Sequence, residues 1–131
     1  MRNCILCALV LLLCGCKTST NRLTPSELEI DASEQYVEVC ATRKINKVFF
    51  NKAKSYPNIH SSDSEYSNGI LTFEESWFKM RVNRNNIDSC NVVKFYIKKN
   101  ESGEKRIINF RVVGDPHFQT PVGTIIQDIQ H

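Results

Sequence analysis

The sequence lacks an apolar run long enough to cross a bilayer. Its main apolar block extends from Ile5 to Leu13, whereas a membrane-spanning helix needs ~20 residues. One charged residue, Arg2, precedes the block, and polar residues follow soon after it. A short charged start, a short apolar core and a polar exit are typical of an export signal. We therefore expect an exported protein.

The apolar block ends in a tetrad formed by Leu13, Cys14, Gly15 and Cys16. Secretory peptidases require small side chains at the cleavage site, and Gly15 precedes Cys16, whereas Leu13 precedes Cys14. The tetrad resembles a bacterial lipobox, in which the last cysteine receives the lipid and becomes the new N-terminus. A plain signal peptide or a buried N-terminal helix is the alternative. Three regions are predicted: a lipoprotein signal peptide over 1–15, a lipidated cysteine and tether over 16–26, and one domain over 27–131.

Motifs for catalysis, for cofactor binding and for metal binding are absent. The sequence has no glycine-rich phosphate loop, no HExxH and no GxSxG. Its three histidines are not spaced as metal ligands. A cation site formed by His60, Asp63 and Glu65 is possible in principle, but a serine-rich acidic segment is usually only solvated. Strong charge is also lacking: the mature chain would carry 16 basic minus 14 acidic residues, or +2. We expect no enzyme, no cofactor and no nucleic-acid partner.

Few cysteines would remain after export. Of six in the sequence, three leave with the signal and Cys16 carries lipid, which leaves Cys40 and Cys90. Two cysteines in an exported protein favour one disulfide. Both lie opposite in phase to the apolar residues of their strands, and these strands are expected to be antiparallel neighbours. We predict a Cys40–Cys90 bridge within one sheet, with two free thiols as the alternative.

Helical periodicity is absent as well, and period-two alternation replaces it. Apolar residues alternate with polar ones in segments near 28–30, 37–41, 45–51, 69–73, 76–82, 91–99, 106–113 and 123–130. This pattern predicts an all-β domain, an immunoglobulin-like antiparallel β-sandwich of seven to eight strands. A small barrel is the alternative. The irregular stretch 54–69 is long enough to be functional or mobile.

The order of these segments carries a family resemblance. The stretches "LEIDASEQYVEVCAT", "SWFKMRV", "VVKFYIKKNESGEKRIINFRVVG" and "TIIQDIQ" resemble small immunoglobulin-like lipoproteins of Bacteroidetes and, more loosely, BACON domains. Asn100, Arg106 and Gln127 fit the family's strand-ending Asn, strand-opening Arg and final Gln. The resemblance implies binding of carbohydrate or mucin.

Five residues are candidates for a ligand-binding surface. If Phe78 is buried, strict alternation places Trp77 outside with Lys79 and Arg81, and an indole beside two cations suits a sugar ring or an anionic glycan. The alternative is that a bulge turns the tryptophan into the core. Tyr56 and Tyr66 frame the irregular stretch and could stack on a ligand or pack against the sheet rim.

These observations favour a lipid-anchored, non-catalytic binding module of the cell envelope, for a glycan or a protein partner. The alternative is an envelope component that joins an assembly through its sheet edges. The lipid on Cys16 implies the outer membrane. Acidic residues do not follow Cys16, which favours the periplasmic face over the cell surface.

Overall fold

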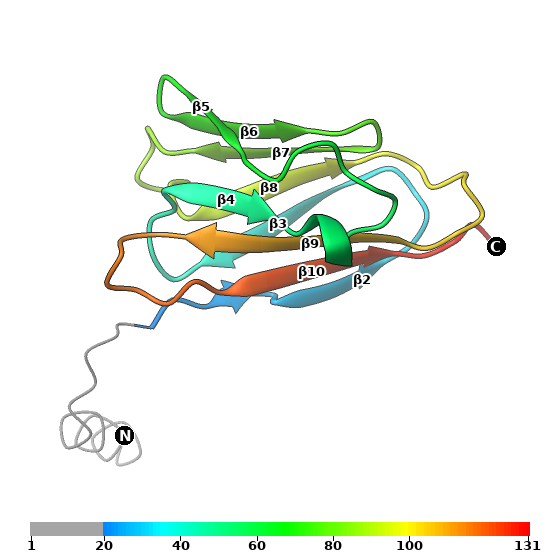
Figure 1. The fold of residues 1–131 in the computed structure, drawn as a ribbon, viewed down its shortest axis with the longest axis horizontal. Coiled ribbons are helices and arrows are strands. Elements are labelled where there is room, and N and C mark those ends of the chain that lie inside the picture. The colour runs from blue at the N-terminus through cyan, green and yellow to red at the C-terminus, as the bar shows by residue number, and fades with distance from the viewer. Residues whose placement is uncertain (1–19) are drawn as a thin grey trace, which may run out of the picture.

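The computed structural model describes residues 20–131, and the predicted signal peptide and Cys16 lie outside this range. Two β-sheets face each other with their strands along the long axis of the molecule (Figure 1). The elements are β1 Leu23–Thr24, β2 Glu27–Ile30, β3 Gln35–Ala41, β4 Lys47–Phe50, the short 3-10 helix η1 Lys52–Lys54, β5 Glu65–Ser67, β6 Ile70–Glu74, β7 Phe78–Asn83, β8 Val92–Ile97, β9 Arg106–Val113 and β10 Val122–Gln127. No helix within 20–131 has the length and apolar character needed to cross a membrane.

The predicted β-sandwich is confirmed, and the two sheets do not close into a barrel. One sheet has six strands in the order β1-β3-β8-β7-β6-β5, and the other has four in the order β2-β10-β9-β4. Every neighbouring pair is antiparallel except β2 and β10, which are parallel. Residues 20–131 form ten strands rather than the predicted seven or eight. The two additional strands are β1 and β5, which are only two and three residues long. Strands this short are below the length at which a period of two can be recognised.

The folded region begins earlier than predicted. Residues 16–26 were expected to form a tether, but β1 pairs with the end of β3, with Leu23 opposite Ala41. Leu23 is buried, and the preceding Asn21 is buried and accepts a hydrogen bond from the Arg43 backbone N–H at 3.2 Å. One leucine in a polar stretch is thus enough to attach this segment, because its side chain enters the core.

The core forms between the inner faces of the two sheets. Alternation along β7 buries Phe78, Met80 and Val82 and exposes Lys79 and Arg81, as predicted. Buried phenylalanines from both sheets meet in the middle: Phe50, Phe73, Phe78, Phe95 and Phe110. The rings of Phe50 and Phe73 stack with centroids 3.9 Å apart. Full burial of each such side chain contributes about 1.5–3 kcal/mol.

The structure explains why two positions, 69 and 123, are occupied by glycine. Asn68 and Gly69 form the two-residue turn between β5 and β6, with φ of 51° and 82°, the conformation that tight hairpins require. Gly123 lies opposite Phe110 in the β9–β10 pair. A Cβ atom at position 123 would lie only 2.4 Å from the Phe110 ring. The missing side chain therefore makes room for a core aromatic ring.

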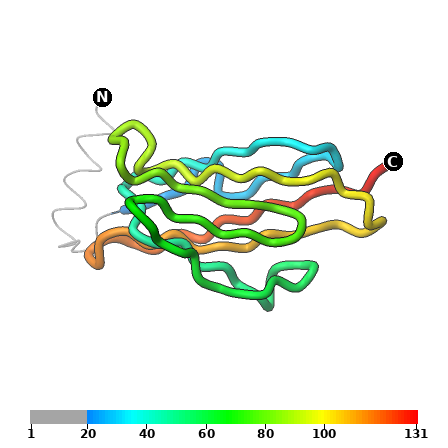
Figure 2. Tube along the Cα trace, turned by 90° about the horizontal axis from the view of Figure 1, so that it is seen from above, coloured from blue at the N-terminus to red at the C-terminus, as the bar shows by residue number. Residues whose placement is uncertain are grey.

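The irregular stretch between β4 and β5 covers an edge of the four-stranded sheet. The Phe50 N–H donates to the Ser62 carbonyl at 2.7 Å, and the Ser64 N–H donates to the Val48 carbonyl at 3.2 Å. Figure 2 shows this segment as a loop that projects from the side of the sandwich. Because an exposed edge strand can pair with another chain, such cover protects β4.

Candidate functional site

Two rows of side chains cross the outer face, the name used here for the solvent-facing side of the six-stranded sheet. Each row consists of residues that lie directly opposite one another on neighbouring strands. The first row is Tyr36, Tyr96, Lys79 and Glu74. The second row is Glu38, Lys94, Arg81, Thr72 and Glu65. Side chains opposite each other on neighbouring strands lie close enough to interact, so each row forms a continuous strip.

The first row starts with the tyrosine platform, formed by Tyr36 and Tyr96. The two ring centroids are 5.0 Å apart and the ring planes are inclined by 41°. The Tyr36 side chain is strongly exposed, at 81%, although a large aromatic ring gains from burial. The Tyr96 hydroxyl donates a hydrogen bond to the Glu34 carboxylate. This bond raises the pKa of Tyr96 above its ordinary value of 10.0, because a neutral phenol can donate to the carboxylate and a phenolate cannot.

Charged side chains follow the platform in both rows. Lys79 Nζ lies 3.5 Å from Glu74 Oε1, and Lys94 Nζ lies 3.9 Å from Glu38 Oε1. All four side chains are more than half exposed, so each pair is worth less than about 1 kcal/mol. Arg81 forms no ion pair within residues 20–131. These charges therefore do little for stability and remain available to a ligand.

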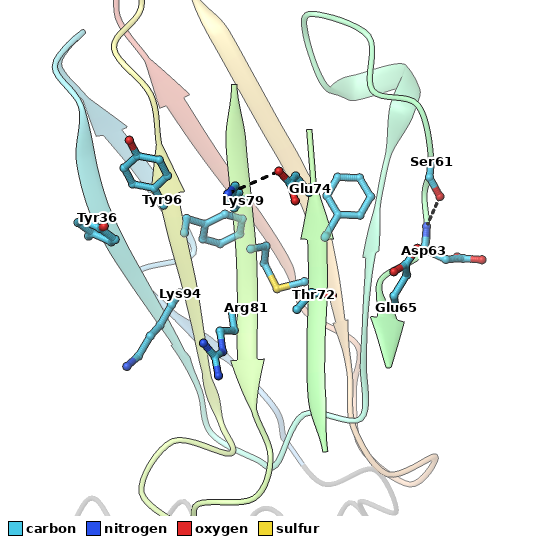
Figure 3. A pocket seen from close by; sticks show the side chains of 13 residues that line it. Tyr36, Ser61, Asp63, Glu65, Thr72, Glu74, Lys79, Arg81, Lys94 and Tyr96 are labelled. Carbon is cyan, nitrogen blue, oxygen red and sulfur yellow. Dashed lines mark hydrogen bonds and ion pairs between the residues drawn. The ribbon is translucent and has the colours of Figure 1, made fainter. Parts of the chain in front are cut away.

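A groove of about 740 Å³ runs along the outer face. Figure 3 shows the tyrosine platform and Lys94 at one side, Lys79 and Arg81 in the middle, and Asp63 at the other side. Small-molecule sites typically measure about 300–1,000 Å³. The groove is thus large enough for a short oligosaccharide or a peptide segment.

Trp77 is not part of the outer face, so its place among the candidate ligand residues has to be corrected. It is only 4% exposed and lies in the core with its neighbour Phe78. Two consecutive residues can both be buried here because β7 begins at Phe78, after a tight turn closed by the Glu75 N–H and the Phe78 carbonyl at 2.9 Å. The alternative in which the chain turns the tryptophan inward is the observed one.

Trp77 belongs to an end cluster with Asn100, Arg106 and Gln127, which closes one end of the sandwich. The Arg106 Cζ atom lies 5.2 Å from the Trp77 ring centroid. Arg106 lies opposite Gln127 in the β9–β10 pair. The Gln127 Nε2 donates to the Lys98 carbonyl at 3.0 Å. Partial burial lowers the pKa of Arg106 below its ordinary value.

Within this cluster, Asn100 secures the β8–β9 turn and the C-terminal end of the chain. Its Nδ2 donates to the carbonyls of Glu104 and Asp128 at 2.8 and 2.9 Å, and its Oδ1 accepts from the N–H and the hydroxyl of Ser102. The side chain is fully buried. The C-terminal end accordingly lies beside the β8–β9 connection (Figure 1). Asn100, Arg106 and Gln127, the residues that fit the family pattern, thus lie in the framework and take no part in the groove.

The two remaining candidate tyrosines do not join the groove. Tyr56 bridges to Ile107 of the four-stranded sheet and donates its hydroxyl hydrogen bond to Glu104. Tyr66 lies on β5 beside Arg84, whose Cζ is 5.4 Å from its ring centroid. Both rings are about half exposed. The five predicted ligand residues are therefore not brought together, and only Lys79 and Arg81 lie at the site.

Sequence reasoning missed the platform itself. The alternation in "EQYVEVC" and "VVKFYIKK" places Tyr36 and Tyr96 on the solvent side of their strands, so their exposure could have been found. Their contact could not, because it depends on the β3–β8 register.

His60 contacts a carboxylate other than the two nearest in sequence. The His60 N–H donates to Glu75 Oε1 at 2.6 Å, and His60 Nδ1 lies 2.9 Å from Glu75 Oε2. Glu75 is buried, so this contact attaches the irregular stretch between β4 and β5 to the sandwich. Within the described residues, His, Cys, Asp and Glu side chains form no group that could hold a metal ion.

The predicted disulfide is not formed: Cys40 and Cys90 are free thiols. Their strands are antiparallel neighbours as expected, but Val92 lies opposite Cys40 in the register. Cys90 lies before β8, in a turn, and its thiol donates to the Ile87 carbonyl at 3.4 Å. The two cysteines are therefore not opposite each other, as the prediction required.

Comparison with known proteins provides a fold but no family. No family model matches the sequence, and no curated protein matches it. An NMR structure of a protein from Bacteroides thetaiotaomicron superposes with a TM-score of 0.52 and 16% identity, over 80% of this chain and 77% of that chain. A GH5 xyloglucanase from Bacteroides ovatus, solved in complex with a XXXG heptasaccharide, has a TM-score of 0.46 and 14% identity, over 80% of this chain but only 17% of the enzyme. The first similarity shows a related fold only, and the second is too weak to support any conclusion about this chain.

Proposed function

We propose that the domain is a non-catalytic binding module that holds a glycan in the groove of the outer face. The main support is the tyrosine platform: Tyr36 is 81% exposed and lies beside Tyr96 in a groove of about 740 Å³. Exposed aromatic rings next to hydrogen-bonding side chains bind the apolar faces of sugar rings. Lys79, Arg81 and Thr72 supply donors and acceptors along the same face.

A glycan array with the full chain in detergent tests this proposal. Tyr36→Ala should abolish binding to the glycans that the unchanged protein retains, because it removes the more exposed ring. Tyr66→Ala is the matched control, since Tyr66 is exposed at 60% but lies outside the groove. Circular dichroism should show that both variants are folded. Retention of all glycans by the Tyr36→Ala variant would contradict the proposal.

We further propose that the module is attached to the outer membrane through a lipid on Cys16, with the domain in the periplasm. The lipobox-like tetrad supports the lipid attachment, and the absence of acidic residues directly after Cys16 supports the periplasmic side. Several acyl chains anchor a protein firmly, so Cys16→Ser should release the domain from membrane fractions or leave the precursor uncut. Cys14→Ser is the matched control, because that residue would be discarded with the signal. Normal membrane partition of the Cys16→Ser variant would exclude lipid attachment at this residue.

Assembly through sheet edges is the weaker alternative. The edge strands β1, β5, β2 and β4 have only two to four residues, and the irregular stretch covers β4. On β2, the glutamates Glu27 and Glu29 are exposed. Short, covered and charged edges oppose strand addition, so a partner strand would have little to bind.

A further inference from the structure

Charge is distributed unevenly along the groove. Lys79, Arg81 and Lys94 lie on the central strands β7 and β8, next to the tyrosine platform. Asp63 and Glu65 line the opposite end. Beside the platform, Glu74 and Glu38 partly offset Lys79 and Lys94, and Glu34 accepts the hydrogen bond of the Tyr96 hydroxyl. The uneven charge along the groove therefore depends on Arg81, while Asp63 and Glu65 repel an anion from the opposite end.

Arg81 differs from the two lysines in having no acidic partner. Lys79 is paired with Glu74 and Lys94 with Glu38, whereas Arg81 forms no ion pair within the described part of the chain. Its side chain is exposed and lines the groove. A guanidinium offers two parallel N–H donors that match a carboxylate or a sulfate. The groove thus contains one unused anion-binding group.

The position of Arg81 relative to the platform restricts the size of the anion. Tyr96 lies opposite Lys79, and Arg81 lies two residues further along β7, opposite Lys94. Tyr96 and Arg81 are diagonal neighbours, whose α-carbons are about 7–8 Å apart. One sugar ring carrying a charged substituent can reach from the platform to the guanidinium.

We propose that the groove binds an anionic sugar. Its ring stacks on Tyr36 and Tyr96, and its carboxylate or sulfate group accepts hydrogen bonds from Arg81. This inference rests on the proposed glycan-binding function and names the class of glycan. The acidic residues Asp63 and Glu65 confine the charged group to the platform half.

Calorimetry with three oligosaccharide probes tests the proposal on the full chain in detergent. The probes are an oligogalacturonate, its fully methyl-esterified and hence uncharged counterpart, and a sulfated galactan oligosaccharide. At least one anionic probe should bind ten-fold or more tightly than the ester, and raised salt should weaken that binding. Tighter binding of the oligogalacturonate identifies a carboxylate, and tighter binding of the sulfated probe identifies a sulfate.

Two arginine variants separate a specific contact from general attraction. Arg81→Gln should weaken binding of the anionic probe by at least ten-fold and leave binding of the ester unchanged. Arg111→Gln is the matched control, because Arg111 is exposed on β9 of the other sheet, and it should leave all affinities unchanged.

The outcomes distinguish this inference from the function on which it rests. If the ester binds as tightly as the anionic probes and Tyr36→Ala abolishes that binding, the anionic ligand is excluded and glycan binding stands. If Arg81→Gln and Arg111→Gln weaken the anionic probe equally, specific recognition by Arg81 is excluded. If no saccharide binds in the probes or on the array, both proposals are excluded.

Discussion

The end cluster and the outer face use aromatic residues in opposite ways. Trp77 is 4% exposed and packs against Phe78 and Arg106, whereas Tyr36 is 81% exposed and contacts Tyr96. Three of the four residues of the end cluster are buried and Arg106 is partly buried, so the cluster contributes to folding, while the outer face leaves a large ring in water. Exposure of such a ring contributes little to folding, so the outer face is the part of the molecule suited to binding.

The largest expected effect is on stability, from Trp77→Ala. Deletion of a buried aromatic side chain costs about 3–5 kcal/mol, while Tyr36→Ala should change the free energy of unfolding by less than about 0.5 kcal/mol. Urea unfolding followed by circular dichroism measures both; fluorescence is unsuitable because Trp77 is the single tryptophan. Equal losses in the two variants would remove the distinction between the end cluster and the outer face.

Alternation made the strands predictable, and the failures have local causes. The phase of β7 was predicted correctly from Phe78 to Val82, but strict alternation carried back to Trp77 gave the wrong face, because a turn ends the pattern at that point. The strands β1 and β5 were too short to show a period.

Contacts between distant segments were less predictable than strand phase. The parallel β2–β10 pair joins segments from the two ends of the domain. The platform likewise needs β3 and β8 in one register. Neither arrangement leaves a pattern within a single segment, so only the exposed positions of Tyr36 and Tyr96 could be obtained from the sequence.

A smaller loss of stability is expected for Asn100→Ala, and this variant extends the comparison from aromatic to polar residues. The asparagine makes four hydrogen bonds from a fully buried position, and leaving a buried partner unsatisfied costs about 1–3 kcal/mol. Asn86→Ala is the matched control, since Asn86 is exposed and accepts one bond, from the Asp88 N–H. Urea unfolding measures both. A loss no larger than that of the control would show that Asn100 is dispensable.

The two cysteines sharpen the comparison because both lie outside the groove: Cys40 is on β3, and Cys90 is in the turn before β8. Since Val92 and not Cys90 is opposite Cys40, we predict that both thiols of the exported protein react with iodoacetamide under non-reducing conditions, and that reductant leaves the unfolding midpoint unchanged. Mass spectrometry counts the alkylated cysteines. A single species with Cys40 and Cys90 unmodified and linked would instead support the bridge expected from the sequence, and would require the β3–β8 register to shift near Cys90.

The smallest effect concerns the protonation of the platform. The hydrogen bond to Glu34 raises the pKa of Tyr96, which means that the folded state favours the neutral phenol. Its contribution to stability is complete below the ordinary tyrosine pKa of 10.0 and is lost as the pH rises through the higher pKa of the folded protein. Glu34→Gln removes the negative charge, so Tyr96 should ionise at a lower pH, nearer that ordinary value. A carbon NMR titration of the ring resolves Tyr96 from the other three tyrosines. An unchanged titration of Tyr96 in the Glu34→Gln variant would show that Glu34 does not hold this ring, and Tyr36 alone would then define the platform.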